Sequence, residues 1–344
     1  MSDRSEGVDA AGSSPVGDEA RSLLQDSLVW DDVLPWTRRS NLGLTDTLLP
    51  RFKEAGVDFV SLTPVGGPGS TLDETINVLA RLRREIAERS DWLVLATSVA
   101  HIRDARTAGK LAVNFNLQET LPFGDSLGTV QLYYDLGVRQ TLLAYNRRNL
   151  VADGCAERTD AGLSRFGVEV VKEMNRVGML VDGTHTGHRS TLDAMEVCEG
   201  PFVFSHSNPY AVHAHYRNIK DDQIKACAAT GGVIGINGVG AFLGDPAAGT
   251  DAIFACLDYV VELVGPQHVG LGLDYVCDPG PLIASANADT LGWPEGVGMG
   301  EFVFAGPEQV GELLQHMLDH GYPHDAITGI LGENWARVCE SVWK

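Results

Sequence analysis

The chain has 344 residues, 44% of them hydrophobic, which is enough to bury the core of one large barrel or of two domains. A formal net charge of −20 argues against nucleic acid or an anionic membrane surface as a partner. The six cysteines are widely spaced and no apolar run reaches 18 residues, so we expect a cytoplasmic protein in a reducing compartment, acting on a small molecule.

The first 22 residues are rich in Ser, Gly, Asp and Glu and offer little to bury, which predicts a mobile tail over residues 1–22. The remainder, 23–344, is expected to form a single domain. Short apolar runs predict nine strands, over 28–30, 57–62, 92–97, 111–118, 140–145, 179–181, 202–204, 233–237 and 269–273. Helical periodicity predicts helices over 44–54, 71–88 (capped by Ser70 or Thr71), 101–108, 126–136, 167–177, 191–198 (capped by Ser190), 221–229, 252–264, 307–320 and 323–339.

Strands and helices alternate along the whole chain, and no hairpin signal joins two apolar runs, so a parallel sheet is required. Nine strands are enough for a (β/α)8 TIM-type barrel, with one strand to spare. No Gly-x-Gly-x-x-Gly follows the first strand, which disfavours a dinucleotide-binding fold. The long stretch 277–302, rich in Gly and Pro, can cover a site, and a disordered insertion is the alternative.

Functional groups in such a barrel gather where the strands end. The polar residues at these positions are Asp31, Asp32, Gln118, Glu119, Tyr145, Asn146, His185, His206, Asn237 and Asp274. His185 and His206 follow two consecutive strands, and imidazole is the commonest transition-metal ligand. We predict that these two histidines hold a divalent metal that activates water. Two hydrogen-bonded core histidines are the alternative.

Two further residues suggest roles beside that metal. Asp274 ends the segment GLGLD, whose small residues let the backbone pack closely beneath a carboxylate, and it is predicted to be a ligand or general base. A turn or helix cap is the alternative for Asp274. Arg217, on a probable loop, can hold a substrate carboxylate through two parallel hydrogen bonds, or can be a solvated surface residue. His188 is either a third metal ligand or faces solvent.

These patterns together resemble the membrane (renal) dipeptidase family, from about residue 26 to the C-terminus. The resemblance rests on AGLSRFGVEVVKEMNRVGMLVD, SHSN, HYRNIKDDQI, GGVIGIN, GLGLD and LGENWARV, together with His185. It implies a barrel that carries two zinc ions on its carboxyl-terminal rim and cleaves dipeptides. By position, it implies that His185 and His206 hold one of these metals. It also implies that Asp274 transfers a proton and that Arg217 holds the carboxylate of the substrate.

The sequence departs from the family pattern at three places. The family's first strand ends in a His-x-Asp pair after Asp-Gly, whereas here Asp26-Ser27 is followed by Leu28-Val29-Trp30. The bridging glutamate matches Gln118, and a histidine expected near the end of the fourth barrel strand matches Tyr145. These changes predict one zinc per chain, held by His185, His206 and Gln118, with the second metal site doubtful. Asp31, Asp32 or Glu119 can replace a lost ligand only if the alignment shifts.

The leading hypothesis is a zinc-dependent hydrolase in which water attacks an amide-type bond of a dipeptide or small nitrogenous metabolite. Asp274 is its catalytic residue, and Arg217, Tyr145 and Asn146 bind the substrate. A lyase or isomerase on the same rim, and a non-catalytic small-molecule-binding protein, are the alternatives. Whether the chain forms a homo-oligomer is left open.

Overall fold

The computed structural model describes residues 16–36, 45–67, 70–293 and 303–344, and every structural statement below concerns these residues. The strands are β1 Trp30–Pro35, β2 Phe59–Thr63, β3 Leu93–Leu95, β4 Leu111–Leu117, β5 Val138–Leu142, β6 Leu180–Asp182, β7 Phe202–Val203, β8 Ile234–Ile236 and β9 Val269–Leu271. The first helices are α1 Asp18–Asp26, α2 Leu48–Glu54, α3 Leu72–Ala87, α4 Val99–Thr107, α5 Gly128–Asp135, α6 Arg165–Val177 and α7 His188–Val197. The remaining helices are α8 Asp221–Ala229, α9 Gly240–Leu243, α10 Thr250–Val264, α11 Pro279–Ala288, α12 Gln309–Asp319, α13 His324–Thr328 and α14 Asn334–Val342.

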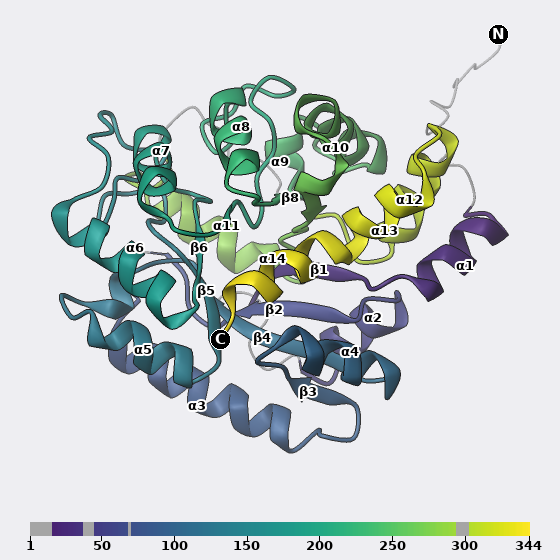
Figure 1. Cartoon of the computed structure of the whole chain (residues 1–344), viewed down its shortest axis with the longest axis horizontal. Coiled ribbons are helices and arrows are strands. Elements are labelled where there is room, and N and C mark those ends of the chain that lie inside the picture. Colours follow the sequence, from purple (N-terminus) through teal and green to yellow (C-terminus); the bar gives the residue numbers. More distant parts are fainter. Residues whose placement is uncertain (1–15, 37–44, 68–69, 294–302) are drawn as a thin grey trace, which may run out of the picture.

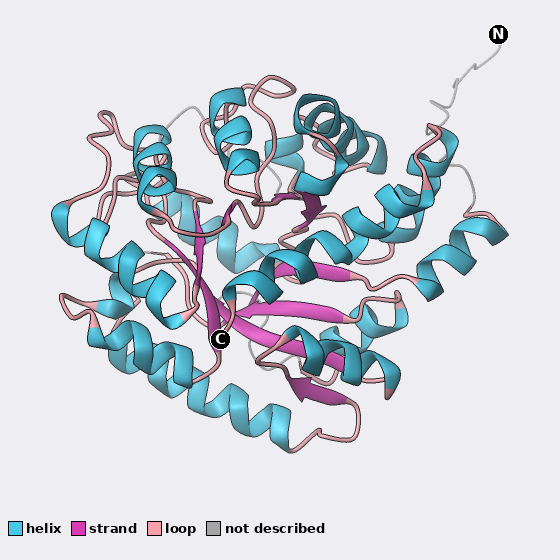
Figure 2. Ribbon diagram, viewed as in Figure 1, coloured by secondary structure: helices cyan, strands magenta, loops and turns pink. Residues whose placement is uncertain are grey.

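The strands form a nearly closed parallel barrel. Eight of them are hydrogen-bonded in the order β7-β6-β5-β4-β2-β1-β9-β8. A parallel bridge between Phe204 and Ile234 links the two ends of this series. The ninth strand, β3, pairs with β4 outside the series. Figure 2 shows the strands in the middle of the molecule with the helices around them. The predicted α/β barrel with one extra strand is therefore confirmed.

Alternation along β4 shows how the sequence gives the barrel two different faces. Leu111, Val113, Phe115 and Leu117 belong to the main apolar cluster, which also contains the buried residues of the surrounding helices. The residues between them include two asparagines that point to the other face because successive side chains of a strand alternate. Asn116 bonds Ser61 and Thr63 of β2 there, at 2.9 Å and 2.8 Å. The inside of the barrel is therefore partly polar.

The end of the barrel where the strands begin is closed by the last helix. Trp335 of α14 is fully buried and its indole Nε1 donates to the carbonyl oxygen of Leu271 at 3.1 Å. It belongs to a second apolar cluster with residues from the start of several strands, namely Trp30, Phe59, Ala112, Leu180, Val203 and Val233. Figure 1 shows α14 lying across the strands. Functional groups are left to the opposite rim.

Several local predictions were wrong. Residues 18–22 of the predicted tail are part of α1, where Ala20 is buried, while residues 1–15 lie outside the described ranges. The first strand begins at Trp30 rather than ending there, because Val33 and Leu34 continue the buried run. Asp31 and Asp32 are therefore inside the strand and not in a loop after it.

Two helix predictions also need correction. Ser190 lies inside α7, and the carboxylate of Asp160 accepts the N–H groups of Arg189 and Ser190 at the start of this helix. The predicted final helix is divided by a π-helical turn over Gly329–Glu333. Within the stretch 277–302, residues Pro279–Ala288 form α11, and residues 294–302 lie outside the described part of the chain.

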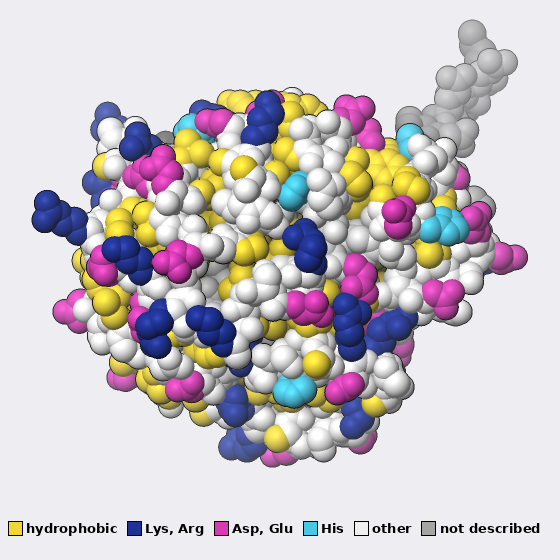
Figure 3. All heavy atoms as spheres, in the orientation of Figure 1, with side chains coloured by type: hydrophobic (Ala, Val, Ile, Leu, Met, Phe, Trp, Pro, Cys, Tyr) yellow, Lys and Arg dark blue, Asp and Glu magenta, His cyan; other side chains and the backbone are white. Residues whose placement is uncertain are grey.

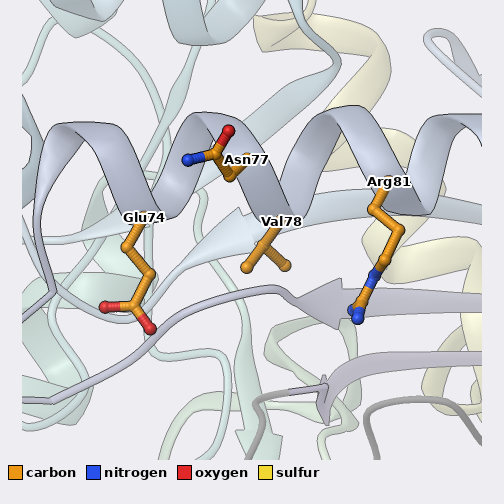
Figure 4. Close-up of a pocket in the computed structure, with 4 residues that line it drawn as sticks. All are labelled: Glu74, Asn77, Val78 and Arg81. Carbon is orange, nitrogen blue, oxygen red and sulfur yellow. The ribbon is translucent and has the colours of Figure 1, made fainter.

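The outer surface of the described chain carries charged side chains of both signs and a pocket along one helix. Basic and acidic side chains are interspersed on the face drawn in Figure 3. A surface pocket lies along α3, lined by Glu74, Asn77, Val78 and Arg81 (Figure 4). These four lining residues belong to a single helix outside the barrel. Among the described helices, none combines the length and the apolar character needed to cross a membrane.

Candidate active site

The two predicted histidines lie side by side at the carboxyl-terminal rim. His185 follows β6 and His206 follows β7, and these strands are neighbours in the sheet. Their ring centroids are 5.2 Å apart and the planes meet at 65°, edge to face. Both side chains are buried, with 4% and 0% of their surface exposed. The structure thus brings together the two imidazoles that the sequence predicted as a pair.

Both histidines are held as neutral rings. Burial lowers the pKa of His185 and of His206 well below the usual value, and the positive charge of Arg217 lowers both further. Nδ1 of His185 lies 2.7 Å from the amide oxygen of Asn146, which can only accept, so this nitrogen carries the hydrogen and Nε2 keeps its lone pair. Nδ1 of His206 lies 2.7 Å from the hydroxyl of Ser205. Nε2 of His206 is buried and has no hydrogen-bond partner among the described residues.

A tyrosine and an arginine border the pair. The ring of Tyr145 stacks on that of His185, with centroids 3.9 Å apart. Arg217 is 3% exposed, and its guanidinium lies over the ring of Phe242 at 5.1 Å. Its Nε is buried without a hydrogen-bond partner among the described residues. A buried guanidinium with a free donor is suited to an anionic ligand, so Arg217 is not a solvated surface residue.

Asp274 lies just beyond the end of β9, close enough to Arg217 for their charges to interact. Burial raises its pKa to about 7, while the positive charge of Arg217 and a hydrogen bond from Asn237 Nδ2 at 3.3 Å act in the opposite direction. A carboxyl group that titrates near neutral pH can both take and release a proton. The glycines before it serve the close packing that the sequence indicated. A Cβ on Gly272 would collide with the carbonyl oxygen of Ser205.

Three of these residues have an unusual backbone conformation. Among the described residues, four that are not glycine have a positive φ, and Asn146, His185 and Asp274 are three of them, at 60°, 65° and 57°. Side chains other than glycine rarely adopt this region, although Asn, Asp and His tolerate it better than most. Such conformations cluster at functional sites, where the surrounding structure enforces them. This is independent evidence that the rim is the site.

Gln118, whose amide is predicted to be a third metal ligand, directly follows the last residue of β4. Nε2 of Gln118 donates to the hydroxyl of Thr63 at 3.3 Å, and its Cβ and Oε1 lie beside Gly66. Because Nε2 is engaged, the amide oxygen is the atom left for other partners. Glu119 points elsewhere, with its carboxylate accepting from Asn149 Nδ2 at 2.5 Å. It does not take the place of a carboxylate at position 118.

His188 does not join the site. Its Nε2 lies 2.8 Å from a carboxylate oxygen of Asp222, and its side chain is 39% exposed. The solvent-facing alternative therefore describes His188, and the third-ligand alternative does not.

Residues that sequence reasoning missed complete the surroundings. The thiol of Cys155 donates to the amide oxygen of Asn146 at 3.2 Å, and burial raises its pKa to about 11. Trp293 meets the rings of Tyr145 and Tyr216 edge to face, each at 6.4 Å. An ion pair between Arg147, next to Asn146, and Asp289, at the end of α11, ties this segment to the rim. The covering role allowed for 277–302 thus fits the described part of that stretch, although no local sequence signal marked Cys155 or Trp293.

The described residues at the rim offer few donors for a cation. Imidazole nitrogens with a free lone pair are among the ligands that zinc binds, and a catalytic zinc usually has three protein ligands. Within the ranges that the structure describes, no three His, Cys, Asp or Glu side chains are grouped so that they can hold a metal ion. His185 and His206 are the imidazoles that the structure brings together, and a two-metal centre has no support in the described residues.

The chain is similar in sequence to known dipeptidases. Residues 28–344 match the family model described as membrane dipeptidase, peptidase family M19. An uncharacterised dipeptidase of Schizosaccharomyces pombe is 31% identical over 285 residues, covering 80% of this chain and 63% of its own length. Dipeptidase aclJ of Aspergillus oryzae is 29% identical over 276 residues, covering 78% and 61%. The chain thus spans less than two thirds of the length of these two relatives.

Solved structures show the same fold. An amidohydrolase from Pseudomonas aeruginosa superposes with a TM-score of 0.84 at 28% identity, covering 94% of this chain and 99% of the other. The probable dipeptidase PvdM from the same organism gives a TM-score of 0.80 at 18% identity, covering 94% and 98%. With a family model matched over nearly its whole length, the chain belongs to the membrane dipeptidase family, peptidase family M19.

Proposed function

We propose that the protein is a zinc-dependent hydrolase that cleaves the amide-type bond of a dipeptide or a small nitrogenous metabolite. The observation that carries this proposal is the pair of neutral, buried imidazoles, with an unpartnered Nε2 on His206, beside the buried guanidinium of Arg217. Family membership and the dipeptidase names of the relatives support the same class of reaction.

His185, His206 and the amide oxygen of Gln118 would hold one zinc ion. Bound zinc would supply Lewis acidity and make a water molecule acidic enough to react near neutral pH. Asn146 fixes the tautomer and orientation of His185, so we assign it a positioning role in addition to its predicted place at the substrate.

Two side chains would serve the substrate directly. Arg217 would pair with a carboxylate and so place the scissile bond beside the histidines. Asp274, with a pKa raised by burial to about 7, would accept a proton from the attacking water and return it to the leaving nitrogen. The stack of Tyr145 on His185 would form one wall of the substrate site.

The remaining parts of this proposal concern the setting of the protein. Five of the six cysteines, Cys155, Cys198, Cys227, Cys256 and Cys339, have free thiols, which supports a reducing compartment such as the cytoplasm. The side chains of His185, His206, Arg217 and Asp274 at the rim agree with a small-molecule substrate.

A substrate comparison tests the proposal. The zinc-loaded protein should release amino acids from a panel of dipeptides, or amines from simple N-acyl amides. Asp274→Asn should lower kcat by about 10²–10⁴-fold, the usual contribution of general acid–base catalysis. Asp278→Asn is the matched control, because this exposed aspartate caps α11 and asparagine caps equally well. An Asp274→Asn variant as active as wild type would contradict the assignment. No turnover of either panel would favour a non-hydrolytic enzyme or a binding protein.

A further inference from the structure

Asp31 is a buried carboxylate whose place beside Asp274 the sequence did not reveal. It lies in β1, opposite Leu271 of β9 in the parallel pairing. The side chain is completely buried. One of its oxygens, Oδ1, accepts the backbone N–H of Leu273 at 2.9 Å. Leu273 is the residue immediately before Asp274. The carboxylate of Asp31 therefore holds the backbone, through a hydrogen bond, directly before the proposed catalytic aspartate.

The segment around Leu273 needs such an attachment. Asp274 has a φ of 57°, a conformation that is unfavourable for a residue with a side chain and persists only where its surroundings enforce it. Among the described residues, Asp31 and Leu271 are the pair that joins β1 to β9, and the β-ladder between these two strands does not continue beyond Leu271. The hydrogen bond to Asp31 therefore continues the attachment of β9 to β1 after regular pairing has stopped.

The carboxyl groups of Asp31 and Asp274 also interact electrostatically. Burial raises the pKa of Asp31 to about 7, the N–H groups of Leu273 and Val33 act against this rise, and the negative charge of Asp274 adds to it. The other oxygen of Asp31, Oδ2, is buried and has no hydrogen-bond partner among the described residues.

We propose that Asp31 is a positioning residue for Asp274: its carboxylate fixes the Leu273 peptide and thereby the direction in which the Asp274 carboxyl group faces the substrate. This inference rests on the proposed function, since it assigns Asp31 a part in the same hydrolysis. The neighbouring Asp32 takes no part in it, because its side chain bonds the indole of Trp30 at 2.9 Å on the other face of the strand.

Three variants of the full chain separate the alternatives. Asp31→Ala removes the acceptor for the Leu273 N–H, Asp31→Asn keeps an oxygen that can accept it, and Asp32→Asn is a matched control on the adjacent residue. The measurements are amide hydrogen exchange at Leu273 and steady-state kinetics on the best dipeptide or N-acyl amide of the panel. The exchange measurement does not depend on activity.

Exchange at Leu273 should be at least about tenfold faster in Asp31→Ala than in wild type, and close to wild type in Asp31→Asn and Asp32→Asn. In Asp31→Ala, kcat should fall about 10²-fold with KM changed by less than about threefold, because a misplaced catalytic group costs about that much. Asp31→Asn should recover most of the lost kcat.

Equal losses in Asp31→Ala and Asp31→Asn, an unchanged kcat in Asp31→Ala, or unchanged exchange at Leu273 would each overturn the positioning role. If wild type shows no hydrolase activity at all, the proposed function fails by itself. The attachment of Leu273 to Asp31 is then decided by the exchange measurement alone.

Discussion

At the scale of single residues, the chemistry of this site depends on side chains that are held in one orientation. His185 stands between the ring of Tyr145 on one side and the amide of Asn146 on the other. Both Asn146 and His185 have a positive φ, so neither side chain is placed by regular strand geometry. The contacts around the imidazole, rather than the strand itself, set the direction of its free nitrogen.

Asn146 is predicted to strengthen zinc binding by holding the ring of His185 in one orientation. Asn146→Ala removes the acceptor that fixes Nδ1–H of His185, and the free ring can then rotate or change tautomer. The dissociation constant for zinc, measured by chelator competition, should rise about 10–100-fold. Asn77→Ala, at an exposed position of α3, is the control and should bind like wild type. Unchanged affinity in Asn146→Ala would show that the orientation of His185 does not matter for the metal.

Gln118 offers the opposite test, a gain of affinity. If its amide oxygen faces the cation, Gln118→Glu supplies a charged oxygen in the same place, and zinc should bind on the order of tenfold more tightly, which corresponds to about 1.4 kcal/mol. The same competition assay measures this change. An affinity equal to that of wild type would mean that Gln118 lies outside the coordination sphere.

At the scale of elements, the sequence predicted most of the strands and the helices between them, because apolar runs of the right length are a strong local signal. It predicted the pair His185 and His206 for the same reason, since each follows such a run. The first strand was misplaced because two adjacent aspartates resemble a loop. Their burial depends on partners far away in the sequence, such as Leu273, and no local pattern contains that information.

The same limit applies to the cover of the site. Trp293 packs against the rings of Tyr145 and Tyr216. The ion pair between Arg147 and Asp289 joins residues that are 142 positions apart in the sequence. Composition alone showed a long stretch rich in Gly and Pro. That signal is compatible with a cover and with disorder, so the sequence left the choice open.

The buried carboxyl group of Asp32, in strand β1, is expected to lower the stability of the folded protein at neutral pH. Burial raises the pKa of Asp32 well above the usual value, a hydrogen bond from Trp30 acts against this, and the charge of Asp182 adds to it. A folded-state pKa above the unfolded one means that the folded protein binds more protons, so its stability falls as pH rises above about 4. Asp32→Asn removes this penalty and keeps an oxygen for the indole of Trp30.

The free energy of unfolding of Asp32→Asn should exceed that of wild type at pH 7, because burial disfavours the charged form of the wild-type carboxyl group. The gain should disappear near pH 3, about one unit below the ordinary pKa of aspartate, where the carboxyl group of wild type holds the proton in both the folded and the unfolded state. Urea unfolding at the two pH values measures the difference. A variant that is less stable than wild type at pH 7 would show that the ionised carboxylate stabilises the barrel.

At the scale of the whole molecule, the barrel separates stability from function along its axis. Trp335 and the second apolar cluster close the end where the strands begin, and the histidines, Arg217 and Asp274 lie where the strands end. Gly270, in β9, and Gly272, just after it, allow close packing at the two ends of the barrel. Gly270 leaves room for the ring of Trp335, and Gly272 leaves room for the backbone at Ser205. The chain thus keeps the fold of its family.

The zinc content of the purified chain, measured by elemental analysis with and without His206, tests the central claim most directly. Wild type should bind about one zinc per chain, as should His188→Ala, in which a histidine outside the site is removed. His206→Ala should bind almost none while circular dichroism shows that it remains folded. A folded His206→Ala variant that retains the zinc content of wild type would contradict the account.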